Sequence, residues 1–124
     1  MRRPLALVID DADDTLEMYA VLLHLEGFAV EEARNGREGI EKAVKFLPDI
    51  IITDLAMPVM DGWEAIRRLR ADERTRHILI VVCSGQEAPR ATRDLPVDVL
   101  LPKPCPLDLL LLEVRRLLRR RAAA

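Results

Sequence analysis

The chain alternates short apolar runs with longer segments in which apolar residues recur every three or four positions. Short apolar runs predict buried strands, whereas the longer periodic segments predict amphipathic helices. The runs predict five strands, over residues 5–9, 28–31, 50–54, 78–83 and 97–101. A helical segment follows each predicted strand, so strands and helices alternate along the whole chain.

Three of the predicted helices begin at a polar residue that can cap them. Asp14, Asn35 and Asp61 each stand three positions before a glutamate, a pattern typical of a helix N-terminus. The fourth helix is expected to be short or irregular, because residues 86–96 contain two prolines. The last helix is expected to begin at Pro106 and to carry arginines in its final turns.

Five strands alternating with five helices predict an α/β fold with a doubly wound parallel sheet, because parallel neighbours require crossover connections. The length of 124 residues allows one domain, over residues 1–124, without an output domain. Half of the residues are hydrophobic and 32% are charged, which excludes a disordered chain. No apolar run is long enough for a membrane span or a signal peptide, so we expect a cytoplasmic protein with no membrane contact.

Five side chains stand where the predicted strands stop, and ligands of such sheets bind at the carboxyl ends of the strands. These side chains are Asp10, Asp11, Asp54, Ser84 and Lys103. Three carboxylates at one edge repel each other, and a hard divalent cation with oxygen ligands relieves that repulsion. Mg²⁺ fits best, because it commonly combines carboxylates with a phosphate oxygen.

A lysine and a hydroxyl beside such a cation favour phosphoryl chemistry, because both stabilise charge on phosphoryl oxygens. We interpret Asp54, which follows a central strand, as a nucleophile that forms an aspartyl-phosphate. Asp10 and Asp11 are interpreted as metal ligands. The two cysteines, Cys83 and Cys105, lack a CxxC spacing and are interpreted as buried reduced thiols.

Four motifs together resemble the receiver domain of two-component response regulators, over residues 5–120: Val8 to Asp11, Thr53 to Gly62, Ser84, and Lys103-Pro104. The resemblance implies the flavodoxin-like strand order 2-1-3-4-5. It implies Asp54 as the phosphoacceptor and a cis bond before Pro104. It also implies Lys103 on a phosphoryl oxygen, Ser84 as the switch hydroxyl, and Mg²⁺ held by Asp10, Asp11, Asp54 and the Ala56 carbonyl.

The function that this resemblance implies is a stand-alone signalling domain rather than an enzyme. Its partners would be a sensor histidine kinase or a histidine phosphotransfer protein as phosphoryl donor, and a downstream protein that responds to phosphorylation. The chain departs from the family at Leu100, where an aromatic switch residue is usual, and at Cys105, where Phe often follows Lys-Pro. The output surface formed by residues 86–100 is therefore expected to be atypical.

Two alternative functions remain open. The run Asp11 to Thr15 reproduces the nucleophile motif of haloacid dehalogenase-like phosphohydrolases, although that hypothesis leaves Asp54 without a role. The other alternative is a receiver-like domain that binds partners without being phosphorylated. The net charge of −2 and the absence of a recognition-helix unit predict no direct contact with nucleic acid.

Overall fold

The structure is a computed structural model that describes residues 2–85 and 96–123. Its five strands are β1 (Leu5–Ile9), β2 (Ala29–Ala33), β3 (Ile50–Thr53), β4 (Leu79–Ser84) and β5 (Val99–Pro102). The helices in these ranges are α1 (Asp13–Leu25), α2 (Gly36–Phe46), α3 (Gly62–Ala71) and α4 (Leu107–Ala123). None of these helices is long and apolar enough to cross a membrane. The short helix expected within residues 86–96 lies almost entirely outside the described residues.

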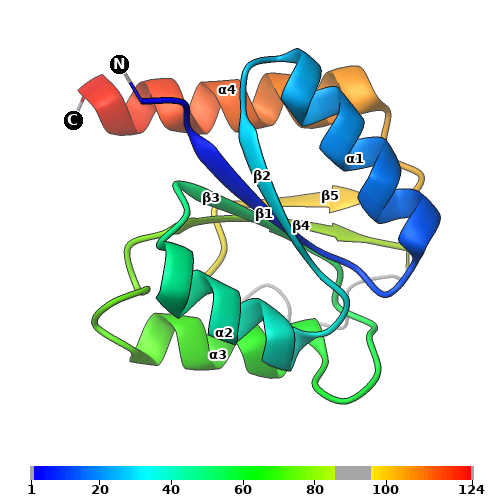
Figure 1. Ribbon diagram of the computed structural model, residues 1–124, viewed down its shortest axis with the longest axis vertical. Helices are drawn as coiled ribbons and strands as arrows, with labels where there is room; N and C mark the ends of the chain where they lie inside the picture. The colour runs from blue at the N-terminus through cyan, green and yellow to red at the C-terminus, as the bar shows by residue number, and fades with distance from the viewer. Residues whose placement is uncertain (1, 86–95, 124) are drawn as a thin grey trace.

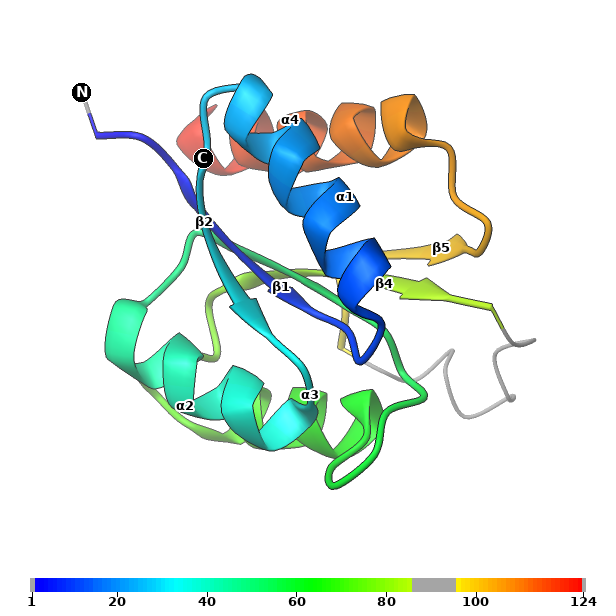
Figure 2. The same ribbon diagram turned by 45° about the vertical axis from the view of Figure 1, so that its right-hand side comes forward.

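The strands form one parallel sheet in the order β2-β1-β3-β4-β5, which confirms the predicted topology. Helices α1 and α4 cover one face of the sheet, and α2 and α3 cover the other (Figures 1 and 2). Strand β2 lies on one side of β1, and β3, β4 and β5 follow one another on the other side. The strand order therefore changes direction between β1 and β3, whose carboxyl ends lie side by side, and ligands of such sheets bind at this point.

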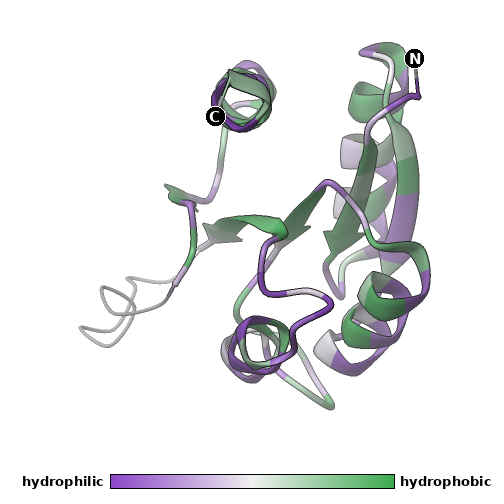
Figure 3. Cartoon of the chain, turned by 90° about the vertical axis from the view of Figure 1, so that its left-hand side faces the viewer, coloured by the Kyte–Doolittle hydropathy of each residue, from purple (hydrophilic) through white to green (hydrophobic). Residues whose placement is uncertain are grey.

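Two apolar layers hold the helices against the sheet. The central strands are hydrophobic along their length (Figure 3). Successive residues of a strand point to opposite faces, so β1, β3 and β4 each supply both layers, whereas β5 contributes Val99 and Leu101 to the layer under α1 and α4. In β3, Ile50 and Ile52 pack toward α1 and α4, while Ile51 packs toward α2 and α3. The continuous apolar runs in the sequence therefore reflect burial on both sides.

The N-terminus of α1 differs from the prediction. The helix begins at Asp13 instead of being capped by Asp14, and its N-cap is Ala12, which offers no capping side chain. The Asp10 carboxylate accepts the Ala12 N–H at 2.9 Å, so this turn is organised by the end of β1. Asp13 and Asp14 instead lie in the first helical turn, where their negative charges interact favourably with the helix dipole.

Several strand boundaries differ from the predicted ones by one or two residues. Strand β2 begins at Ala29, not Phe28, because the Phe28 N–H closes the end of α1 by donating to the Leu23 carbonyl. Strand β5 runs over Val99–Pro102 rather than 97–101 and ends beside Ser84. Helix α2 is closed by Leu47, a half-exposed residue that forms its left-handed C-cap.

The predicted caps of α2 and α3 are confirmed, and Asn35 provides a test. Its side-chain oxygen accepts the Glu38 N–H at 2.9 Å. We expect Asn35→Ala to lower the free energy of unfolding by about 1 kcal/mol, because this N–H loses its partner. Asn35→Asp keeps the accepting oxygen and should remain near wild type in the same urea titration. Equal stability of all three proteins would contradict the capping role.

Candidate functional site

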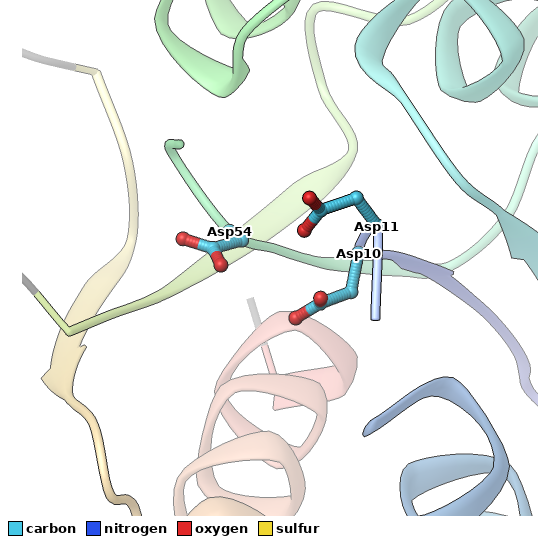
Figure 4. A group of neighbouring side chains, drawn as sticks. All are labelled: Asp10, Asp11 and Asp54. Carbon is cyan, nitrogen blue, oxygen red and sulfur yellow. The ribbon is translucent and has the colours of Figure 1, made fainter. Parts of the chain in front are cut away.

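Three aspartates meet at the carboxyl edge of the sheet. Asp10 and Asp11 follow β1, and Asp54 follows the neighbouring strand β3 (Figure 4). One carboxylate oxygen from each of them lies within 4.8 Å of the others. Asp10 is buried and Asp11 is exposed, so the cluster extends from the interior to the surface. The predicted acidic edge is therefore present in the fold.

Lys103, just beyond the end of β5, lies between two of these carboxylates. Its Nζ is 2.8 Å from Asp10 Oδ2 and 2.9 Å from Asp54 Oδ2. Burial alone would lower the pKa of the lysine, but its hydrogen bonds with Asp10 and Asp54 and their charges raise it above the ordinary value. The amine is therefore protonated at neutral pH and balances much of the negative charge of the pair.

Backbone N–H groups orient the same two carboxylates. Asp54 Oδ1 accepts the Leu55 N–H at 2.6 Å and the Ala56 N–H at 3.3 Å. Asp10 Oδ1 accepts the Ala12 N–H at 2.9 Å, so each carboxylate has one oxygen on the backbone and the other on Lys103. A carboxylate that is hydrogen-bonded at both oxygens keeps a defined orientation. Such an orientation favours a reaction at that carboxylate, because the reacting atoms are already positioned.

Ser84 and the Lys103-Pro104 bond complete the edge. Ser84 is 6% exposed at the end of β4, and its carbonyl accepts the Lys103 N–H at 2.9 Å. The Lys103–Pro104 peptide bond is cis, as the resemblance implied. The structure thus brings together Asp10, Asp11, Asp54, Ser84 and Lys103, while Ala56 lies on the loop that follows Asp54.

Gly62 is a positioning residue that the sequence analysis named only as the end of the Thr53 to Gly62 motif. Its N–H donates to the Leu55 carbonyl at 2.8 Å, which ties α3 to the loop after β3. A Cβ at this position would lie 2.1 Å from the Asp54 carbonyl oxygen, closer than any side chain tolerates. Only glycine allows this approach, and the Asp-Gly pair at residues 61 and 62 was the available signal.

The donor set fits Mg²⁺. Carboxylate oxygens from adjacent strand ends are ligands that this hard cation prefers, and the partly exposed rim leaves space for water or a phosphate oxygen. Asp10, Asp11 and Asp54 would hold the ion. Lys103 already occupies one oxygen of Asp10 and one of Asp54, so it limits how much of their charge is available to a cation.

Comparison with known proteins agrees with the resemblance to response regulator receiver domains. A family model described as the response regulator receiver domain matches residues 6–115. The chain is 37% identical over 120 residues to the DNA-binding dual master transcriptional regulator RpaA of Synechocystis, covering 94% of the chain. It is 36% identical over 115 residues to the response regulator MprA of Mycolicibacterium vanbaalenii, covering 92% of the chain. The chain spans about half the length of these relatives, 50% of each.

Solved structures agree with this match. The chemotaxis response regulator CheY4 of Vibrio cholerae superposes with a TM-score of 0.85 at 29% identity, covering 93% of this chain and 98% of that one. A CheY-like receiver domain from Methanospirillum hungatei, at 20% identity, shares the fold with a TM-score of 0.92 over 98% of each chain. The chain belongs to the response regulator receiver domain family of two-component signalling. Receiver domains are signalling domains that take phosphoryl groups from histidine kinases.

Asp11 offers a test of the metal site. We expect Asp11→Asn to weaken Mg²⁺ binding about tenfold or more, because it removes one carboxylate ligand from the cluster. Asp14→Asn is the matched control, since Asp14 is exposed on α1 and outside the cluster. Binding is followed by the fluorescence of the single tryptophan, Trp63, in α3. Equal affinities of the two variants would exclude Asp11 from the site.

Gly62 offers a second test. We expect Gly62→Ala to lower the free energy of unfolding by about 2 kcal/mol, because the new methyl group collides with the backbone at Asp54. Gly85→Ala is the control, since a Cβ there would come no closer than 3.6 Å to the other residues that the structure describes. It should stay within about 0.5 kcal/mol of wild type. Urea denaturation measures both, and an undisturbed Gly62→Ala would contradict the close packing.

Proposed function

We propose that Asp54 accepts a phosphoryl group from a phosphohistidine, and that the phosphorylated protein signals through changed protein contacts. The observation that carries this proposal is the Lys103 amine between Asp10 and Asp54 beside a third carboxylate. A group of carboxylates that could hold a cation, a restrained Asp54 carboxylate and the positive charge of Lys103 share one edge, and phosphoryl transfer uses these three features together. Mg²⁺, when bound, would neutralise charge on the phosphoryl oxygens.

In the proposed reaction, a carboxylate oxygen of Asp54 attacks phosphorus, the new O–P bond forms, and the P–N bond to histidine breaks. The histidine ring leaves with the electron pair of that bond and takes up a proton. The amides of Leu55 and Ala56 hold the Asp54 carboxylate in place during the attack. We propose that Lys103 then pairs with a phosphoryl oxygen, and that the Ser84 hydroxyl donates a hydrogen bond to another.

The proposed donors are a sensor histidine kinase or a histidine phosphotransfer protein. The output rests on a population shift: the doubly charged phosphoryl group favours an arrangement in which Ser84 and Lys103 approach it. Leu100 is 43% exposed on β5, in the place of the usual aromatic, so the response must use other side chains there. The cytoplasmic location and the single-domain organisation remain predictions. The expected absence of nucleic-acid contact is unsupported, because one relative is described as DNA-binding.

Asp54→Asn tests the phosphorylation site. Wild type incubated with Mg²⁺ and a small acyl-phosphate should gain the mass of one phosphoryl group, and the product should be acid-stable and base-labile. Asp54→Asn should gain nothing, because a carboxamide is a poor nucleophile toward phosphorus. Asp14→Asn, the matched control, should be phosphorylated like wild type. Intact-mass spectrometry measures all three proteins.

Two results would contradict the proposal and point to an alternative. A folded wild-type protein that gains no phosphoryl group from any competent donor would favour a domain that only binds partners. Turnover of small phosphate esters that is lost in Asp11→Asn and kept in Asp54→Asn would favour the phosphohydrolase.

A further inference from the structure

The loop between β3 and α3 holds one residue in an unusual backbone conformation. Val59 has a φ of 68°, in the left-handed region, and Leu47 is the other non-glycine residue found there in the described part of the chain. The Met60 N–H donates to the Pro58 carbonyl at 2.8 Å and closes a three-residue turn around Val59. A turn of this kind with a positive φ is rare and strained, and a β-branched residue is poorly suited to it.

Contacts at both ends of the loop impose this turn. The Gly62 N–H donates to the Leu55 carbonyl at 2.8 Å, and the Gly36 N–H at the start of α2 donates to the Met60 carbonyl at 2.9 Å. A Cβ at Gly36 would lie 2.6 Å from that Met60 oxygen, so the loop packs tightly against α2 as well as α3. The chain between these contacts turns sharply, because strain persists where the surrounding structure enforces it.

The Val59 side chain itself contributes little to the fold that strains it. It is 78% exposed, so little of its apolar surface is buried. Glycine adopts the same φ without steric cost, and asparagine tolerates it better than valine. Leu47 differs, because its left-handed conformation closes α2 and lets its N–H donate to the Ala43 carbonyl at 2.9 Å. The stability of the isolated chain therefore does not explain a valine at residue 59.

The loop that carries Val59 also holds the proposed phosphoacceptor. It begins with the Leu55 and Ala56 amides that bind the Asp54 carboxylate, and Val59 follows Asp54 by five residues. The loop stands out from the body of the molecule beside the N-terminal ends of α2 and α3 (Figures 1 and 2). A phosphohistidine has to bring its phosphorus within bonding distance of Asp54. A protein that carries this group therefore covers the loops around Asp54, whereas a small donor does not.

A second exposed apolar surface lies on the opposite side of the same edge. Met18 on α1 is 46% exposed, and with Lys103, Pro104 and other residues it lines a cavity of about 380 Å³. Helix α1 covers one face of the sheet and α3 covers the other, so this cavity and the loop of Val59 flank the carboxyl edge (Figure 1). Lys103 itself pairs with Asp54. A partner that contacts both surfaces therefore lies across the phosphoacceptor.

We propose that Val59 is a recognition residue, which the protein that donates a phosphoryl group to Asp54 buries on binding. This inference rests on the proposed function and describes its partner, a protein with an apolar recess beside its phosphohistidine. Burial in the complex gives the valine side chain the hydrophobic stabilisation that it lacks in the free chain. A small phosphoryl donor makes no such contact, so Val59 acts on protein donors alone.

The test compares a protein donor with a small donor on the full folded chain. The protein donor is the histidine kinase or phosphotransfer protein of the same organism that binds wild type most tightly, and the small donor is phosphoimidazole. We expect Val59→Gly to raise the KM for transfer from the protein donor about tenfold, with kcat nearly unchanged, because it removes a contact that ground and transition states share. Phosphorylation by phosphoimidazole should keep its wild-type rate.

Three further variants separate recognition from effects on the backbone. Val59→Ile keeps a β-branched apolar side chain and should accept phosphoryl groups like wild type. Val59→Asn suits the left-handed φ but is polar, so it should unfold at a higher urea concentration than wild type and still show the raised KM. Leu47→Gly is the matched control, because it relieves the other left-handed residue at the far end of α2. It should leave transfer from both donors unchanged.

Several results would overturn the proposal. Equal KM values for wild type, Val59→Gly and Val59→Asn would exclude Val59 from the donor interface. Slower phosphorylation of Val59→Gly by phosphoimidazole would show that the residue acts on the site instead of the donor. A lower urea midpoint for Val59→Asn would show that the valine is not strained. A chain that no histidine kinase or phosphotransfer protein of the organism binds would have no such donor to recognise.

Binding without phosphoryl transfer separates this inference from the proposed function. Calorimetry with the unphosphorylated donor protein measures affinity alone, and Val59→Gly should bind about tenfold more weakly than wild type. Wild type that gains no phosphoryl group from either donor would reject the proposed function, while the affinities would still decide whether the donor protein contacts Val59. Equal affinities with normal phosphorylation would reject recognition by Val59 and leave the proposed function intact.

Discussion

The Lys103 amine between Asp10 and Asp54 is the interaction on which the site depends. It joins the ends of three strands, β1, β3 and the edge strand β5, across the middle of the sheet. The two carboxylates are almost buried, with 3% and 13% of their side chains exposed, so their charges would repel strongly without the lysine. In the proposed function, the Lys103 amine leaves these carboxylates when a phosphoryl group, which carries more negative charge, is added to Asp54.

Movement of the amine is useful only if the carboxylates stay fixed, and the backbone provides that restraint. Leu55, Ala56 and Ala12 donate N–H groups to the carboxylate oxygens that face away from Lys103. Gly62 brings the start of α3 against the Asp54 carbonyl, where a side chain would not fit. Asp54, the proposed nucleophile, is thus held by the backbone, and its positive partner is the long side chain of Lys103 just beyond the edge strand β5.

The sequence predicts the sheet and the location of the site well, because buried parallel strands are continuous apolar runs and each stops at a polar residue. Strand ends also determined which side chains would meet, since parallel strands share one carboxyl edge. Two kinds of feature escaped. The start of α1 follows from the Asp10 contact with Ala12, which no local capping pattern reveals. The close approach of Gly62 to the Asp54 carbonyl depends on how the loop after β3 folds back, which the capping pattern at Asp61 does not reveal.

The alternation of side chains along β4 connects the acidic edge with the apolar core. Ser84 ends β4 at the acidic edge, while its neighbour Cys83 faces the layer under α1 and α4. The Lys103 N–H donates to the Ser84 carbonyl, so β4 and the loop that carries Cys105 are already joined by one hydrogen bond. The same short stretch of backbone thus faces the acidic edge through Ser84 and the apolar layer under α1 and α4 through Cys83.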